Sequence, residues 1–158
     1  MSALESTADI AATAGDLVLD VSLSCAWCFA DEASDGAWAI LEQLQTHQAH
    51  VPALWLSETA NVLVQAERRG RISGTACRTF LGLLEDLPIS VDQPSTASVW
   101  HDTLALARSH RLTSYDAAYL ELALRRGLPL ASRDKALQAA ARTEGVPLLP
   151  SRMHPYQQ

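Results

Sequence analysis

The 158-residue sequence predicts a three-layer α/β/α domain with a mainly parallel central sheet. Short apolar runs alternate with longer segments whose apolar residues recur every three or four positions, the pattern of buried strands that alternate with amphipathic helices. A content of 48% hydrophobic and 19% charged residues is typical of a globular chain, and the length is that of one ordinary domain. We therefore expect a single domain over residues 16–151, with flexible tails at 1–15 and 152–158.

The composition excludes several classes of protein. No apolar run approaches the roughly 20 residues that span a bilayer, and residues 1–15 contain no Lys or Arg, so they lack the basic start of a secretory signal. We expect a cytoplasmic protein with no membrane association. The three cysteines, Cys25, Cys28 and Cys77, are too few for a disulfide framework, and the Cys25–Cys28 pair has no second pair or His cluster to complete a zinc site.

Charge is distributed unevenly along the chain. Residues 1–67 carry ten acids and no Lys or Arg, whereas the remainder carries twelve bases and eight acids. One part of the surface is therefore expected to attract polyanions although the net charge of the chain is −6. The alternative is that these blocks of charge do not form one patch in space.

The first predicted strand ends in an acid. Leu17, Val18 and Leu19 are an apolar run followed by Asp20, as in a buried parallel strand, and ligand sites in open α/β sheets lie at the carboxyl ends of such strands. Asp20 is therefore a candidate site residue. One or two helices follow over residues 23–44, with a break at residues 31–35.

A second acid lies on a predicted helix. The run His50–Pro52 reads as a short strand, and a helix follows it up to Gly70, because proline is tolerated where a helix begins. Glu58 and Asn61 share a face of this helix by their spacing, as do Leu54, Val62 and Gln65. A buried carboxylate costs several kcal/mol unless it is paired or bound to a cation, and no Lys or Arg shares this face. The alternative is that Glu58 is exposed.

The middle of the chain predicts two more helices around a strand at residues 88–91. Ser73 is placed to cap the first of them, and the second begins at about Thr96. The apolar spacing predicts that the first helix buries Ala76, Phe80, Leu83 and Leu84 beside Ile72, and that the second buries Val99, Trp100, Thr103, Leu104 and Ala107.

The last predicted strand lies between two helices that each begin near an acid. Thr113 or Ser114 caps a helix that carries Asp116 in its first turn and ends at Gly127. A strand at residues 128–131 follows, and Ser132 and Asp134 begin the final helix. Each acid has an ordinary explanation, because a carboxylate in the first turn is favoured by about 0.3–1 kcal/mol and an aspartate is a common helix cap.

Together the four acids predict a metal site. Asp20, Glu58, Asp116 and Asp134 come from four elements whose ends meet at one edge of such a sheet. Carboxylates so close together raise one another's pKa unless a divalent cation neutralises them. Ligation by oxygen atoms without His or Cys selects Mg²⁺ or Mn²⁺, and such ions commonly act on phosphodiester or phosphoryl groups.

Four segments resemble the PIN-domain ribonucleases, most closely the VapC-type toxins of toxin-antitoxin pairs. They read LVLDVSLSCAWCFADE, VPALWLSETANVL, LTSYDAAYLELA and LPLASRDKALQAAA, with GVPLLP after the last. The match in order and spacing runs from about Leu17 to Pro150. Ser132 stands where the family more often has Thr, which keeps a hydroxyl near Asp134. The resemblance implies a PIN-like fold for the predicted domain.

The resemblance also implies a reaction and partners. The acidic quartet would bind Mg²⁺ or Mn²⁺ and position a water molecule for in-line attack on an RNA phosphodiester, with Ser22, Asn61 and Ser132 beside it and no nucleotide cofactor. The family implies a homodimer that is inhibited by a cognate VapB-type antitoxin, whose basic side chain can enter the acidic site. Six arginines are weak candidates for contacts with RNA phosphates: Arg68, Arg69, Arg71, Arg125, Arg126 and Arg133.

Two other functions compete with this hypothesis. A phosphoacceptor signalling domain requires a Lys on a later strand, but the only Lys is Lys135 at a predicted helix start. A catalytically silent PIN-like module that binds RNA or protein is the second alternative. The intact acidic quartet argues against it, because a module that only binds has no reason to keep four carboxylates that repel one another.

Overall fold

Five parallel strands form the centre of the computed structural model, which describes residues 14–151. The sequence-predicted tails therefore lie outside the described residues, except for residues 14 and 15. The strands are β1 (Leu17–Leu19), β2 (Ala49–Pro52), β3 (Ile89–Asp92), β4 (Leu130–Ala131) and β5 (Leu148–Leu149). The helical elements are α1 (Val21–Ser24), η1 (Cys25–Trp27), α2 (Asp35–Gln43), α3 (Leu54–Arg68), α4 (Gly74–Asp86), η2 (Ser98–Thr103), α5 (Leu104–His110), α6 (Ser114–Arg126) and α7 (Lys135–Thr143).

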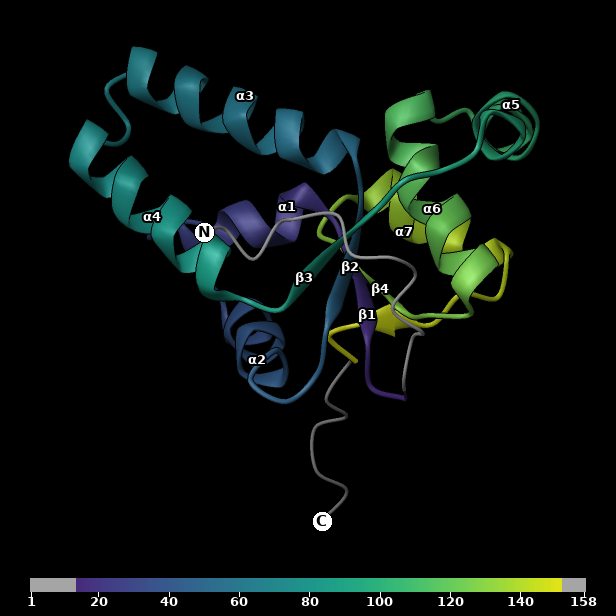
Figure 1. The fold of residues 1–158 in the computed structure, drawn as a ribbon, viewed down its shortest axis with the longest axis horizontal. Helices are drawn as coiled ribbons and strands as arrows, with labels where there is room; N and C mark the ends of the chain where they lie inside the picture. The colour runs from purple at the N-terminus through teal and green to yellow at the C-terminus, as the bar shows by residue number, and fades with distance from the viewer. Residues whose placement is uncertain (1–13, 152–158) are drawn as a thin grey trace.

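Helices cover both faces of the sheet (Figure 1). Helices α1 to α4 lie on one side of the strands, and α5, α6 and α7 lie on the other. Helix α6 packs directly on β1 and β2. The predicted three-layer α/β/α architecture is thus confirmed.

The sheet has the strand order β3-β2-β1-β4-β5, and every strand pair in it is parallel. The central strand β1 pairs with β2 on one side and β4 on the other, and its three residues are fully buried. In a parallel sheet the carboxyl ends of all strands point to one edge. Asp20 after β1 and Ser132 after β4 therefore lie next to each other at that edge.

Side chains at three predicted helix starts accept the backbone hydrogen bonds that define a cap. Ser73 Oγ accepts from the Ala76 amide at 3.0 Å, and Thr113 Oγ1 accepts from the Asp116 amide at 3.1 Å. Asp134 Oδ1 accepts from the amide of Leu137 at 2.7 Å. These bonds satisfy amides that have no partner within the helix. The capping role predicted for these residues is therefore confirmed.

Helix α3 is rotated relative to the prediction. Its buried residues are Trp55, Thr59, Leu63 and Ala66, whereas Asn61 is exposed and Glu58 lies at the margin of the buried face. The prediction that Asn61 points inward is wrong. The physical reason is the large indole of Trp55, which is buried and donates from Nε1 to Ser24 Oγ at 3.1 Å.

The inward faces predicted for the middle of the chain are also partly wrong. On α4 only Phe80 and Leu84 are buried, because this helix contacts the domain along one narrow stripe. On η2 and α5 the buried residues are Thr103 and Ala107. The wider turns of η2, a stretch of π-helix, shift the apolar spacing that the sequence suggested. The residues predicted to be buried but found exposed are Ala76, Leu83, Val99, Trp100 and Leu104.

Candidate active site

Asp20 is the centre of the candidate site. It follows β1, its residue is 2% exposed, and its backbone amide donates to the carbonyl oxygen of Ala131 at 2.9 Å. Two serines donate to the same carboxylate oxygen, Oδ2: Ser22 at 2.6 Å and Ser132 at 2.7 Å. Burial and hydrogen bonds from two separate segments thus fix the position of this carboxylate.

The two serines also tie the last loop to the site. The Arg133 amide donates to Ser22 Oγ at 2.9 Å, and the Asp134 amide donates to Ser132 Oγ at 3.0 Å. Each hydroxyl therefore accepts from a backbone amide while it donates to Asp20. This network holds the segment after β4 against the segment after β1, so that Asp134 lies beside Asp20.

Glu58 reaches the site from α3 and is held by a residue of α6. Tyr119, which is fully buried, donates from its hydroxyl to Glu58 Oε1 at 2.6 Å. Burial raises the pKa of Tyr119, and the bond to Glu58 raises it further, so the phenol remains a proton donor at neutral pH. No polar role was predicted for Tyr119. A buried tyrosine generally needs a hydrogen-bond partner for its hydroxyl, and this requirement is the sequence signal that could have predicted a polar contact of Tyr119.

The four acids influence one another electrostatically. Burial raises the pKa of Asp20 above its ordinary value of 3.8; the bonds from Ser132 and Ser22 oppose this, and the charges of Asp116 and Asp134 add to it. Burial likewise raises the pKa of Glu58, to which the charges of Asp20 and Asp116 contribute. The pKa of Asp116 is raised by burial and then by the charge of Asp134. The structure therefore brings all four carboxylates into one neighbourhood.

The donor chemistry fits a hard divalent cation. Within residues 14–151 no Lys or Arg forms an ion pair with Asp20, Glu58 or Asp116, so their mutual repulsion is not offset by a protein cation. The side chains are not drawn together to ligating distance: in the described part of the chain, no three His, Cys, Asp or Glu residues are arranged to hold a metal ion. Oxygen donors that repel one another match the preference of Mg²⁺ or Mn²⁺.

A cleft of about 380 Å³ adjoins the acids and carries two of the candidate arginines, Arg71 and Arg133. Its lining also includes Ser22, Asp134 and Glu32. Arg71 donates to both carboxylate oxygens of Asp31 at 2.8 Å and lies over the ring of Phe29 at 3.9 Å. Arg133 is 4.0 Å from Glu32 and is exposed. Both guanidinium groups thus border the site.

The remaining candidates lie in different surroundings. Arg68 and Arg69 are exposed at the end of α3. Arg125 is held by Asp92 and Glu121, with its shortest bond, from Nη2 to Asp92 Oδ2, at 2.6 Å, and Arg126 donates to Asp92 Oδ1 at 2.9 Å. Because the carboxylates at the end of β3 and on α6 engage Arg125 and Arg126, we do not assign RNA phosphates to these two residues.

Fold and site together define a class: a three-layer α/β protein with a carboxylate site at the carboxyl edge of a parallel sheet. Residues 17–143 match the family model of the PIN domain. The chain is 34% identical over 121 residues to Ribonuclease VapC3 of Pyrobaculum aerophilum, an alignment that covers 77% of this chain and 91% of that protein. The chain belongs to the PIN-domain family, and its predicted resemblance to VapC-type proteins is confirmed.

Solved structures show the same fold. The crystal structure of PAE2754 from Pyrobaculum aerophilum is 26% identical, covers 91% of this chain and 90% of its own, and superposes with a TM-score of 0.64. A toxin-antitoxin complex from Klebsiella pneumoniae contains a chain that is 19% identical, with a TM-score of 0.52 over 75% of this chain and 86% of its own. The latter similarity supports the fold alone.

No helix among residues 14–151 has the length and apolar character needed to cross a membrane.

Proposed function

We propose that this chain is a cytoplasmic, Mg²⁺- or Mn²⁺-dependent endoribonuclease of the VapC type. The observation that carries the proposal is the buried carboxylate of Asp20 at the end of the central strand, with the charges of Asp116 and Asp134 acting on it. The family and the name of the relative, Ribonuclease VapC3, support the same activity. In this proposal RNA is the substrate and a phosphodiester bond is hydrolysed.

The four acids would hold the cation: Asp20, Glu58, Asp116 and Asp134. When bound, the ion supplies positive charge that offsets the phosphate and lowers the pKa of water. Ser22 and Ser132 keep the carboxylate of Asp20 in one orientation, and Tyr119 does the same for Glu58. Loss of such a supporting hydrogen bond commonly lowers metal affinity or activity by roughly 10- to 100-fold. Asn61 remains a candidate for a polar role at the exposed margin of the site.

An antitoxin partner is supported by an apolar groove between α3 and α4. The groove has a volume of about 280 Å³, and apolar atoms dominate its lining. Leu56, Val64 and Leu81 line it and are exposed. Exposed apolar surface of this kind is typical of a protein interaction site. We propose that a VapB-type antitoxin covers this groove and neutralises the enzyme with a basic side chain placed near the acids.

A homodimer is supported by a second exposed apolar region, on η2, α5 and the start of α6. Trp100 is 70% exposed and Tyr115 is 63% exposed, and α6 packs against both η2 and α5. Val99 and Leu104 are exposed nearby on the same elements. We propose that a second copy of the chain covers this region, which lies beside Asp116.

Incubation with total cellular RNA tests the activity. The protein is purified with its antitoxin, freed from it, and assayed with and without Mg²⁺ or Mn²⁺. Wild type is expected to cut a restricted set of RNAs only with the ion present, whereas Asp20→Ala and Asp116→Ala are expected to be inactive. Equal cleavage by wild type and both variants would indicate a contaminating nuclease. Binding of RNA without cleavage under every condition would favour the alternative function, a silent binding module.

A further inference from the structure

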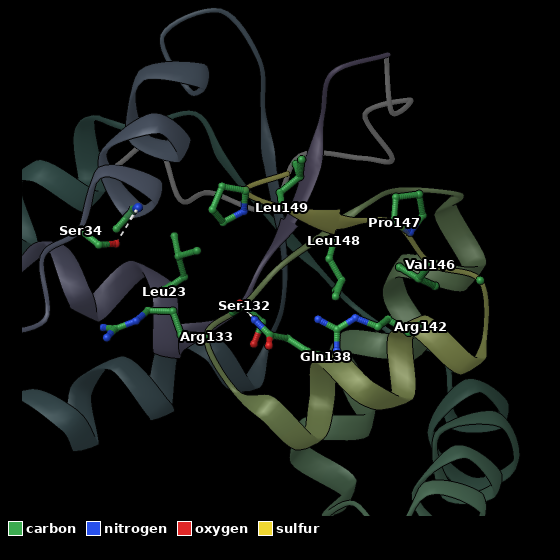
Figure 2. Close-up of a pocket in the computed structure, with 13 residues that line it drawn as sticks. Leu23, Ser34, Ser132, Arg133, Gln138, Arg142, Val146, Pro147, Leu148 and Leu149 are labelled. Atoms are coloured by element: carbon green, nitrogen blue, oxygen red, sulfur yellow. Dashed lines mark hydrogen bonds between the residues drawn. The ribbon is translucent and has the colours of Figure 1, made fainter. Parts of the chain in front are cut away.

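A large second cleft opens beside the acidic site, on the side of β4 and β5 (Figure 2). It has a volume of about 770 Å³ and lies between the start of α2 and helix α7. Its apolar floor comes from the last strand and its neighbours, with Val146, Leu148, Leu149 and Pro150. Gly36 at the start of α2 leaves space for Pro150, because a Cβ atom at this glycine would lie 2.7 Å from Pro150 Cγ.

The polar lining of this cleft is basic. Arg133 and Arg142 line it together with Gln138, Ser34 and Ser132, and no Asp or Glu is among the lining residues. Arg142 extends into the cleft from the last turn of α7 (Figure 2). Within residues 14–151 no carboxylate forms an ion pair with Arg142, in contrast to Arg71 in the neighbouring cleft. Its positive charge is thus available to a ligand.

The cleft adjoins the carboxylate site through Ser132 and Arg133. Ser132 lines it and donates to Asp20 Oδ2 at 2.7 Å, and Gln138 Nε2 donates to the carbonyl oxygen of Ser132 at 2.7 Å. Arg133 lines both this cleft and the smaller one that contains Arg71 and Asp134. A chain that passes the acids therefore meets basic side chains on both sides, with Arg133 between them.

We propose that the cleft between α2 and α7 binds the segment of single-stranded RNA that flanks the cleaved bond, and that Arg142 and Arg133 contact its phosphates. The proposal rests on the proposed nuclease function. The guanidinium group of Arg142 has no carboxylate partner within residues 14–151, and that of Arg133 has only the 4.0 Å contact with Glu32. Together with the absence of carboxylates from the lining, these groups suit a polyanion, because each arginine that neutralises a phosphate releases a counterion. The apolar floor offers contact area to bases or riboses without selecting a sequence.

The test compares Arg142→Gln with Arg108→Gln. Both arginines are exposed in the last turn of a helix, but Arg108 lies on α5, outside the cleft. An RNA that wild type cleaves is assayed at full length and as a short version trimmed to the nucleotides around the cut. Arg142→Gln is expected to raise KM for the long RNA about five-fold, to leave kcat within about two-fold, and to make the salt dependence of log(kcat/KM) shallower by about 0.7.

The short RNA should be cleaved equally well by all three proteins, and Arg142→Lys should restore most of the affinity for the long RNA. If Arg142→Gln matches Arg108→Gln on both substrates, the cleft does not bind RNA. The proposal is also overturned if Arg142→Gln lowers kcat/KM equally for the short and the long RNA. The same holds if this variant loses only affinity for the antitoxin. If wild type itself cuts no RNA, the nuclease assignment fails as well, so the two failures are distinguishable.

Discussion

Tyr119 donates a 2.6 Å hydrogen bond to Glu58, although the two residues are 61 positions apart in the sequence. The bond connects α6, on one face of the sheet, with α3, on the other (Figure 1). It therefore passes over the edge where Asp20 lies. One buried phenol thus holds in place a carboxylate on which the negative charges of Asp20 and Asp116 act.

Removing this hydroxyl should weaken the site more than the fold. For Tyr119→Phe we expect a nuclease rate about ten-fold lower and a loss of about 1–2 kcal/mol in the free energy of unfolding, because Glu58 keeps partial access to water. Thr46→Val is the control, since it removes an exposed hydroxyl between α2 and β2, away from the acids. Cleavage rates and urea unfolding measure the two effects. A rate for Tyr119→Phe equal to that of the control would show that the bond does not position Glu58.

Ser132 should act through its hydroxyl rather than its size. Ser132→Ala removes the bond to Asp20 and the acceptor for the amide of Asp134, so we expect activity to fall about 10- to 100-fold. Ser132→Thr keeps the hydroxyl and should stay near wild type. Steady-state cleavage of the same RNA by both variants measures this. If threonine is as harmful as alanine, packing and not hydrogen bonding governs the position.

The ionised carboxylates should cost stability until a cation binds. The pKa of Asp116 is raised above 3.8 by burial and by Asp134, so its charged form is less favourable in the folded protein than in the unfolded one. Protonation of Asp116 therefore stabilises the folded protein. This contribution is complete below pH 3.8, the ordinary pKa, and is lost as the pH rises through the raised pKa of the folded protein. Asp116→Asn should therefore be at least as stable as wild type at neutral pH.

Thermal unfolding with and without Mg²⁺ or Mn²⁺ measures this effect. The ion should raise the Tm of wild type by preferential binding to the folded state and should raise that of Asp116→Asn much less. Equal shifts in both proteins would place the ion elsewhere.

The contribution of Asp92 to stability should depend on pH in the opposite direction to that of Asp116. Burial opposes its ionisation, but hydrogen bonds from Arg125 and Arg126 outweigh burial and lower its pKa below 3.8. Stability from this cluster is thus present above pH 3.8 and is lost as the pH falls through the lowered pKa. Asp92→Asn should reduce the free energy of unfolding at neutral pH by about 1–3 kcal/mol, given that Arg125 is partly exposed.

Urea unfolding at a series of pH values tests this cluster. The difference between wild type and Asp92→Asn should narrow as the solution is acidified below pH 3.8. RNA cleavage at neutral pH should be retained. A constant difference at all pH values would show that the cluster stabilises the fold by packing and not by charge.

The sequence by itself determined the layers, the parallel sheet and the helix caps. Strand runs and helix caps are local features. Burial on both faces of the sheet selects apolar residues in a strand such as Leu17–Leu19. A helix amide without a partner selects a capping side chain such as Ser73 or Thr113. The positions of Asp20 and Asp134 after predicted strands likewise indicated that both lie at one edge of the sheet, whereas the pairing of β1 with β4 is known only from the structure. These inferences need only the period of the apolar residues and the direction of parallel strands.

Only the tertiary structure decided how the elements turn and what their side chains meet. The rotation of α3 depends on the burial of Trp55, which leaves Asn61 exposed. The partner of Glu58 is Tyr119, and the carboxylate partner of Arg125 and Arg126 is Asp92; none of these pairs is close in sequence. Arg142 faces a cleft because β5 and α2 form its other walls. Such contacts arise from packing between distant segments, so the spacing of residues along the chain does not encode them.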